Sequence, residues 1–185
     1  MDLLWADFIN SEWHDWRGQR VPEDRLKSPE WLSAFLQEHG LAAPVPPAPA
    51  EMQALKELRA CLRSMLARVA AGECLGEADV AALNGLMAAG PVSRQMGVKD
   101  GAYRLDLVPL DEGWTRVQAE VAASFARTLS EGEAGRVRIC GNADCLWAFY
   151  DDTRNRTKKF CDDKLCGNLV KVRRFRAKQK AAQGG

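Results

Sequence analysis

The chain has 185 residues, with 26 lysine and arginine against 25 aspartate and glutamate residues and a formal net charge of +1. This length allows one ordinary domain, or a medium domain with a small appended module. The N-terminus lacks the basic flank of a signal peptide, and no apolar run is long enough to span a bilayer. We therefore expect a cytoplasmic protein with no membrane segment.

The net charge hides an asymmetry along the chain. Residues 153–180 contain eleven basic and two acidic residues, so this stretch carries +9 and the remainder carries −8. A basic C-terminal stretch joined to an acidic body predicts that the basic part meets a polyanion.

The first segment is rich in aromatic residues, and its pattern does not define its secondary structure. Asn10, Trp13 and His14 are a mixture of polar and aromatic side chains that could line a mostly apolar pocket for a small-molecule effector. The alternative is that the tryptophans belong to the core or to a subunit interface, which would suit a homo-oligomer. Both interpretations stay open.

Three helices are predicted next along the chain. Ser28-Pro29-Glu30 is typical of a helix start, and we expect this helix to end near Gly40. Residues 41–50 contain four prolines and no charge, which predicts an extended connection. Apolar residues at helical spacing then predict a helix over 52–69, with Arg59 among the charged residues on its other side, and a shorter helix over 77–89. The apolar residues expected to face inward on the shorter helix are Val80, Leu83, Leu86 and Met87.

A β-hairpin and a further helix complete the N-terminal part. Asp100-Gly101 is a common tight turn, and it joins residues 92–98 to a segment in which Tyr103, Leu105 and Leu107 alternate with charged residues. A helix over 114–129 follows. The fold class expected is α+β: a mostly helical domain with a β-hairpin or small sheet over 1–133, and a zinc module over 134–185.

The four C-terminal cysteines predict that zinc module. Cys140, Cys145, Cys161 and Cys166 have the spacing C-x4-C-x15-C-x4-C, which lets two turns each supply two corners of a tetrahedral site for one structural Zn²⁺. We expect Gly141-Asn142 to take positive φ, a small hairpin between the two pairs, and a basic helix after them, as in a treble-clef finger. Buried thiols without metal and a redox switch are the alternatives. Both histidines, His14 and His39, are distant in sequence, which argues against catalytic zinc.

These residues resemble a known family. The two cysteine pairs, Phe149 with Asp151 and Thr153, the run Lys158-Lys159-Phe160-Cys161, and Cys166-Gly167-Asn168 resemble the CGNR zinc finger. The opening Asp7-Phe8-Ile9-Asn10-Ser11 resembles that of the ABATE domain, which precedes this finger in proteins described as stress-induced transcription regulators. Two positions depart from the pattern: Leu169 stands where the family has Arg, and Phe160 stands where Trp is usual.

The resemblance and the charge together predict a DNA-binding transcriptional regulator. Phosphate contacts are expected from Lys171, Arg173, Arg174, Arg176 and Lys178, on double-stranded DNA. An RNA- or protein-binding zinc module is the alternative, and a merely solvated basic helix is the plainest one. No nucleophile motif, phosphate loop or paired carboxylate accompanies His14, so we expect no enzyme.

Overall fold

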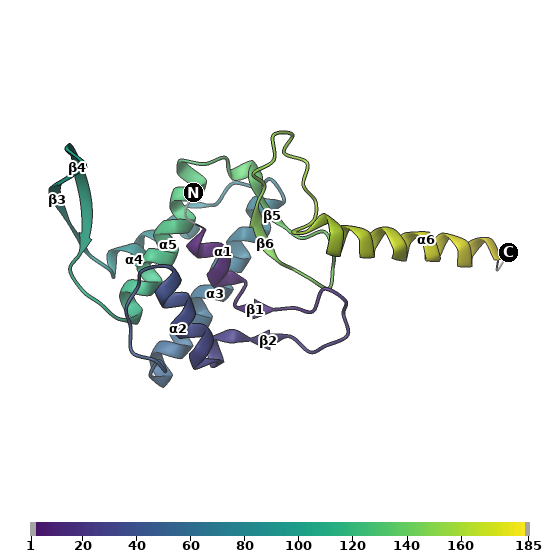
Figure 1. Cartoon of the computed structure of the whole chain (residues 1–185), viewed down its shortest axis with the longest axis horizontal. Coiled ribbons are helices and arrows are strands. Elements are labelled where there is room, and N and C mark those ends of the chain that lie inside the picture. The colour runs from purple at the N-terminus through teal and green to yellow at the C-terminus, as the bar shows by residue number, and fades with distance from the viewer. Residues whose placement is uncertain (1–2, 184–185) are drawn as a thin grey trace.

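The computed structural model describes residues 3–183 and shows a helical body from which a β-hairpin and a C-terminal helix project in different directions (Figure 1). The body contains α1 (Leu4–Ile9), α2 (Pro29–Glu38), α3 (Pro49–Ala70), α4 (Glu77–Ala88) and α5 (Trp114–Ser130), and the C-terminal helix is α6 (Asn168–Gln183). The strands of the described chain form three antiparallel pairs: β1 (Glu12–Trp13) with β2 (Glu23–Asp24), β3 (Val92–Lys99) with β4 (Ala102–Pro109), and β5 (Val137–Ile139) with β6 (Ala148–Tyr150). Short helical turns are η1 (Arg25–Lys27), η2 (Ala134–Arg136) and η3 (Asp163–Gly167). The predicted α+β class is confirmed.

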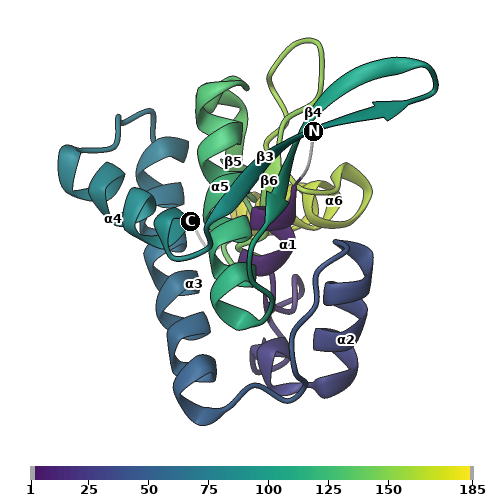
Figure 2. The same ribbon diagram turned by 90° about the vertical axis from the view of Figure 1, so that its left-hand side faces the viewer.

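The aromatic N-terminal segment supplies the centre of the hydrophobic core. Helix α1 is short but almost wholly buried, and Figure 2 shows it enclosed among the longer helices. Trp5 is 0% exposed; its ring lies 5.4 Å from that of Phe125, and its indole N–H donates to Thr128 at 2.9 Å. This tryptophan is therefore a core residue with its polar atom satisfied.

Helix α2 starts where predicted, whereas α3 starts earlier than the predicted residue 52; both starts follow ordinary capping rules. The hydroxyl of Ser28 accepts a hydrogen bond from the backbone N–H of Trp31 at 3.2 Å, and Pro29 occupies the first helical turn. The proline-rich connection runs only to Ala48, because Pro49 and Ala50 already belong to α3. Proline is well placed at a helix start, where its missing N–H has no helical partner.

One side chain of α3 lies on the opposite side from the one predicted. Arg59 is 7% exposed and faces the core side of the helix, where its guanidinium donates to Ser11 at 2.9 Å and to Asp24 at 2.7 Å. A buried guanidinium needs such partners to offset the loss of water. Arg59 therefore ties α3 to the segment that carries β1 and β2.

Helix α4 packs on the outside of the body and buries little of its own surface. Of its four apolar residues expected to face inward, only Leu83 is buried, and Val80 is 47% exposed. At its end, a Cβ on Gly90 would lie 2.4 Å from that of Ala119 on α5, so the close approach of the two segments requires glycine.

The predicted hairpin, β3 and β4, follows α4, and its turn lies at the predicted residues. Lys99 pairs with Ala102, which leaves Asp100 and Gly101 as the two-residue turn, with φ of 52° and 78°. The alternation of apolar and polar residues would normally bury one face of such a hairpin. Here the whole hairpin stands away from the helices (Figure 1), and both faces are exposed.

Candidate metal centre and basic helix

The four predicted cysteines meet in one cluster. Their sulfur atoms all lie within 4.8 Å of one another; the Cys145–Cys161 distance is 3.7 Å and the Cys161–Cys166 distance is 3.8 Å. A zinc ion with Zn–S bonds of about 2.3 Å in a tetrahedron separates its sulfurs by about 3.8 Å. The donor set and its spacing thus fit a closed, four-thiolate zinc site.

The first cysteine pair lies in the loop that joins β5 to β6. The N–H of Cys140 donates to the Trp147 carbonyl at 2.9 Å, and the N–H of Cys145 donates to the Asn142 carbonyl at 2.9 Å. The hairpin therefore encloses the first pair, whereas the sequence led us to expect it between the two pairs. Residues 151–160 form an irregular loop instead.

The expected positive φ occurs at a different residue. Neither Gly141 nor Asn142 has positive φ, while Leu146, directly after the second cysteine, has φ of 53°. Glycine is needed at 141 for another reason: its N–H donates to the Lys159 carbonyl at 2.7 Å, and a Cβ would lie 3.0 Å from that same oxygen. Gly141 lets the loop before Cys161 pack directly on the first turn.

The second cysteine pair leads into α6. Asp162 caps the π-helical turn η3 by accepting from the N–H of Leu165 at 2.8 Å, and Cys166 lies within that turn. A Cβ on Gly167 would lie 3.2 Å from the ring of Phe160, so the aromatic ring packs against the glycine backbone. Phe160 keeps the packing role expected for the usual Trp. The helix thus starts directly from the metal cluster.

A buried carboxylate organises the loop between the pairs. Asp151 is 0% exposed and accepts hydrogen bonds from the Thr153 N–H at 3.0 Å, the Thr153 hydroxyl at 2.5 Å and the Lys158 N–H at 2.9 Å. Burial alone would raise its pKa, but these hydrogen bonds outweigh burial and lower the pKa below the usual value. Asp151 therefore stays ionised and holds the loop in position.

The crowded thiols affect one another strongly. The hydrogen bond from Cys145 lowers the pKa of Cys140 to about 2, whereas the hydrogen bond to Cys140 raises the pKa of Cys145 to about 12. Hydrogen bonds with these two residues also raise the pKa of Cys161. Without a cation, one thiolate is favoured and its neighbours are kept protonated. A divalent zinc ion would replace those protons and allow four thiolates at once.

The cluster is tied to the N-terminal segment. The side-chain amide of Asn142, 1% exposed, donates to the Trp16 carbonyl at 2.7 Å and lies 3.5 Å from the sulfur of Cys166. Trp16 packs against the apolar shell of the cluster. The N-terminal loop is therefore one wall of the finger.

The finger also shares the main core. Val137 on β5 and Ala148 on β6 are at most 1% exposed and belong to the same buried cluster as the helices of the body. The amide of Asn10 reaches the backbone of Ala148 from the end of α1. Packing between residues 3–132 and 134–183 is thus continuous, and the division at 133/134 stays a prediction from the sequence.

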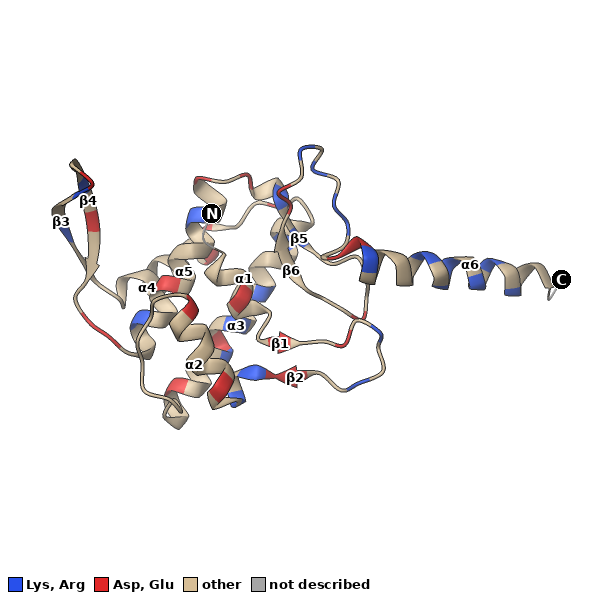
Figure 3. Ribbon diagram, in the orientation of Figure 1, with Lys and Arg blue, Asp and Glu red and all other residues tan. Residues whose placement is uncertain are grey.

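Helix α6 is basic and uncovered. It contains six lysine and arginine residues and no acidic residue, and none of its residues is buried. Figure 3 shows blue segments along the helix and in the loop above it, with a short red segment between them, and shows that the helix extends away from the body. The apolar side expected on this helix remains largely open, since Phe175 is 61% exposed.

One of the predicted phosphate-binding residues has partners within the protein. Arg173 forms an ion pair with Asp144 and donates to the Arg17 carbonyl at 2.8 Å. The facing Gly18 approaches closely, because a Cβ there would lie 2.8 Å from the Asp144 carboxyl carbon. Arg173 thus anchors the first turns of α6, while Lys171, Arg174, Arg176 and Lys178 are exposed to solvent.

The residues predicted to form a ligand pocket do not share one cavity. Asn10 is 4% exposed, and both ends of its amide are occupied by Ala148. Trp13 and His14 line a hollow of about 280 Å³ beside the zinc cluster, together with Trp16 and Trp147. A ligand at Asn10, Trp13 and His14 stays a prediction, and the structure gives Asn10 a joining role.

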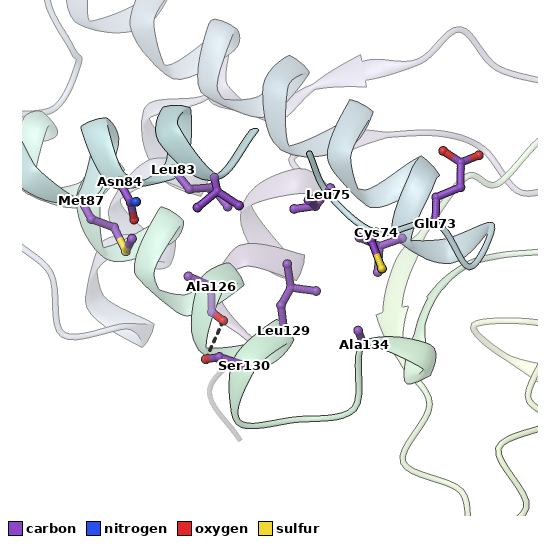
Figure 4. A pocket seen from close by; sticks show the side chains of 12 residues that line it. Glu73, Cys74, Leu75, Leu83, Asn84, Met87, Ala126, Leu129, Ser130 and Ala134 are labelled. Carbon is purple, nitrogen blue, oxygen red and sulfur yellow. Dashed lines mark hydrogen bonds between the residues drawn. The ribbon is translucent and has the colours of Figure 1, made fainter. Parts of the chain in front are cut away.

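A larger apolar pocket lies elsewhere in the body. It measures about 380 Å³ and opens between α4, the end of α3 and the end of α5 (Figure 4). Its wall is mostly aliphatic, with Leu75, Leu83, Met87 and Leu129 pointing inward, and Asn84 lies at its edge (Figure 4). Sequence patterns could not have found it, because three separate segments build its wall.

The geometry defines a zinc-finger protein in which a four-cysteine site, with a basic helix starting from it, is joined to a mostly helical domain. Residues 2–132 match the family ABATE, described as "Putative stress-induced transcription regulator", and residues 136–179 match the CGNR zinc finger. The chain belongs to the ABATE family and carries a CGNR zinc finger for one structural zinc ion. The resemblance seen in the sequence is confirmed.

No curated protein sequence matches the chain. Among the described residues, 3–183, no helix has the length and apolar character needed to cross a membrane.

Proposed function

We propose that the protein is a transcriptional regulator that binds double-stranded DNA, with the zinc site holding α6 against the duplex. The observation that carries this proposal is the charge of α6: six cations and no acid over Asn168–Gln183, on a helix with no buried residue. Ordinary solvated helices mix acids with bases. A helix whose charged residues are all cations, and which is fixed at one end by a zinc site, is suited to bind a polyanion.

The cations of α6 form two stripes. At 3.6 residues per turn, Lys171, Arg174 and Lys178 share one side of the helix, and Arg173, Arg176 and Lys180 share the opposite side. The major groove of B-DNA accommodates an α-helix. Cations on both flanks of such a helix would meet the phosphates on both walls of the groove, which supports DNA as the partner.

The loop before Cys161 offers further phosphate contacts. Arg154 and Lys159 are exposed there, beside a polar hollow of about 400 Å³ that also includes Thr157. Because Asp151 fixes this loop and Gly141 fixes its end, these cations have a defined place relative to α6. Contacts from two separate elements would set the orientation of the finger on the duplex.

A binding assay with matched variants tests the proposal. Affinity for labelled random-sequence duplex DNA, measured by fluorescence anisotropy, should fall with salt with a log-log slope of about −0.9 per phosphate neutralised. Arg174→Ala should weaken binding and flatten the slope by about one unit. Lys99→Ala, which removes an exposed cation at the hairpin turn, should change neither.

The same assay separates the alternatives. Equal affinity for duplex RNA of the same length would favour the RNA-binding module, since phosphate contacts alone do not distinguish DNA from RNA. No binding to either at low salt would remove the regulator proposal and leave a protein-binding finger.

Leu169 allows a test of the family position. Leu169 is half-buried in the first turn of α6, where the family has Arg. Leu169→Arg should strengthen DNA binding if that side chain reaches phosphate. An unchanged affinity would mean that the family residue only braces the finger.

A small-molecule effector is the second candidate function, and the pocket in Figure 4 favours it. Its volume of about 380 Å³ lies in the range of small-molecule sites. Such sites are lined mostly by apolar side chains, with a few polar groups that orient the ligand. An uncharged, largely apolar molecule with one group for the Asn84 amide fits this chemistry. Binding of Nile red should be lost in Ala126→Phe, which fills the pocket, and kept in Ala82→Phe, which adds the same ring to an exposed position of α4. Equal binding by both variants would contradict a site here.

We place the protein in the cytoplasm, because four thiolates stay available for zinc in a reducing compartment. The role requires binding and no catalysis. A homo-oligomer would double the number of phosphate contacts and is included in the proposal.

A further inference from the structure

The β3–β4 hairpin has one apolar and one polar face. Residues that pair across the hairpin share a face, so the pairs Met96–Leu105 and Val98–Tyr103 lie on the same side as Leu107. The opposite side carries the pair Gln95–Asp106 and the ion pair of Arg104 with Asp106. The exposed fractions on the apolar side are 76% for Met96, 68% for Val98, 80% for Tyr103, 68% for Leu105 and 60% for Leu107.

Such a face is unfavourable in an isolated chain. A two-stranded hairpin is marginal in water unless its apolar face is covered, and large contiguous apolar patches on soluble proteins mark interaction surfaces. Helices α4 and α5 pack against each other but not over this hairpin (Figure 1). Within residues 3–183, nothing covers the apolar face.

We propose that this face binds the same face of a second copy of the chain, which forms a two-fold dimer. The five apolar side chains each have roughly 100 Å² to bury, or about 500 Å² per copy. Two copies would therefore bury about 1,000 Å² in total, which is the lower limit for a specific protein interface. A two-fold contact between identical apolar faces satisfies both copies at once and closes the assembly.

Charge fixes the relative direction of the two hairpins. Arg94 lies on the apolar side near the hairpin base, opposite Leu107, and Asp100 lies in the turn. No ion pair of Arg94 or Asp100 is seen within the described chain. If the hairpins pack antiparallel, the turn of each lies over the base of the other, so that each Arg94 approaches the partner's Asp100 and two complementary pairs form at the rim. A parallel arrangement would instead bring the two Arg94 side chains together.

The chemistry of the face selects protein over nucleic acid. Arg94 is the single cation among its apolar residues, so phosphate would find little to bind there. The basic helix α6 lies at the other end of the molecule from the hairpin (Figure 1). Pairing through the hairpins therefore leaves both basic helices free.

The test compares one added charge on the two faces. In sedimentation velocity from roughly 1 to 100 µM, the full-length zinc-loaded chain should show a concentration-dependent monomer–dimer equilibrium. Leu105→Lys places a charge on the apolar face and should raise the dissociation constant at least about tenfold. Gln95→Lys places the same charge on the polar face and should leave it unchanged. At concentrations well below the dissociation constant, where all three chains are monomeric, the thermal midpoints of both variants should match the wild type, because the hairpin stands away from the core.

A second set of variants tests the direction of packing and avoids adding a charge to the apolar face. Tyr103→Ser should weaken the dimer without adding charge. Arg94→Gln and Asp100→Asn should each weaken it, and the double variant should be no weaker than either one, because both remove the same ion pair. A wild-type chain that stays monomeric throughout, with or without binding to phosphatidylcholine vesicles, would overturn the proposal. So would a dimer that Leu105→Lys and Tyr103→Ser leave intact. None of these measurements involves DNA, so they stand apart from the proposed regulator role.

Discussion

The side-chain amide of Asn10 forms two hydrogen bonds with the backbone of Ala148, donating to its carbonyl at 2.9 Å and accepting from its N–H at 2.8 Å. Asn10 ends α1, and Ala148 begins β6 next to the first cysteine pair. The amide acts as a one-residue strand added to the edge of the finger. This contact joins parts of the chain that are 138 residues apart.

Asn10→Asp should destabilise the protein. The carboxylate can accept from the Ala148 N–H but cannot donate to its carbonyl, which would be left buried without a partner. A loss of about 1 to 3 kcal/mol in the free energy of unfolding is expected, measured by urea denaturation. Asn84→Asp, at an exposed position of α4, should change stability by less than about 0.5 kcal/mol. Equal effects of the two changes would show that the Asn10 contact contributes nothing.

Metal analysis should find one zinc per chain. Cys161→Ser should remove most of it, because the hydroxyl is a poor replacement for a thiolate ligand. Cys74→Ser changes an exposed cysteine outside the cluster and should retain the full metal content. A wild type purified without zinc under reducing conditions, or a Cys161→Ser variant that keeps it, would contradict the site.

Chelation should affect more than the finger. Since Val137 and Ala148 belong to the main core, loss of zinc should lower the thermal midpoint of the entire chain and expose amides of α1 and α3 to hydrogen exchange. If α1 and α3 keep their full protection in the metal-free protein, the packing between finger and body does not stabilise the body.

Gly141→Ala should weaken the metal site although glycine has no special φ there. The added Cβ would lie 3.0 Å from the Lys159 carbonyl, whose backbone position is set by its hydrogen bond with the same residue. We expect a loss of about 1 to 3 kcal/mol in stability and faster transfer of zinc to a chromogenic chelator. Gly135→Ala is the matched control, because a Cβ there meets open space. Equal zinc-transfer rates for the two variants would rule out the close contact.

The buried ion pair of Arg59 and Asp24 should matter more than a surface pair. Arg59→Met leaves the Asp24 carboxylate partly buried without its partner and should cost about 2 to 3 kcal/mol. Arg68→Met breaks the pair with Asp79; because the Arg68 side chain is 37% exposed, this change should cost clearly less than Arg59→Met. Urea unfolding of both variants checks the difference, and the reverse order would contradict it.

The ion pair of Arg59 and Asp24 also predicts that the free energy of unfolding depends on pH in the acid range. Burial alone would raise the pKa of Asp24, but the hydrogen bond and charge of Arg59 hold it below the ordinary 3.8. The stabilisation is therefore complete above the unfolded pKa and is lost as the pH falls through the lower folded pKa. Asp24→Asn should show a shallower loss of stability than the wild type below about pH 5. Zinc release in acid is common to both chains, so parallel pH curves would exclude a contribution from Asp24.

Features governed by neighbouring residues were predictable from the sequence. The cysteine spacing, the Ser28-Pro29 helix start and the Asp100-Gly101 turn each depend on a few adjacent residues, and all three are confirmed. Arg59 was assigned to the wrong side of α3 because its partner Asp24 lies 35 residues away. The joining role of Asn10 and the anchoring of Arg173 by Asp144 depend on equally distant partners. Hydrophobic periodicity carries no information about such pairs.

The shared core has a consequence for how this finger can be moved between proteins. The inward side chains of β5 and β6, Val137 and Ala148, are covered by α1 and α3. A chimera that transplanted residues 134–185 onto an unrelated scaffold would bring its cysteines and its basic helix, but it would also bring an uncovered apolar strand pair and lose the Trp16 wall beside the metal. The reciprocal fragment, ending at 133, would expose the matching surface of the helices. Gene fusion or recombination at this boundary therefore yields two fragments with exposed apolar surfaces that favour aggregation. The new scaffold would have to supply a substitute for α1 and for Asn10.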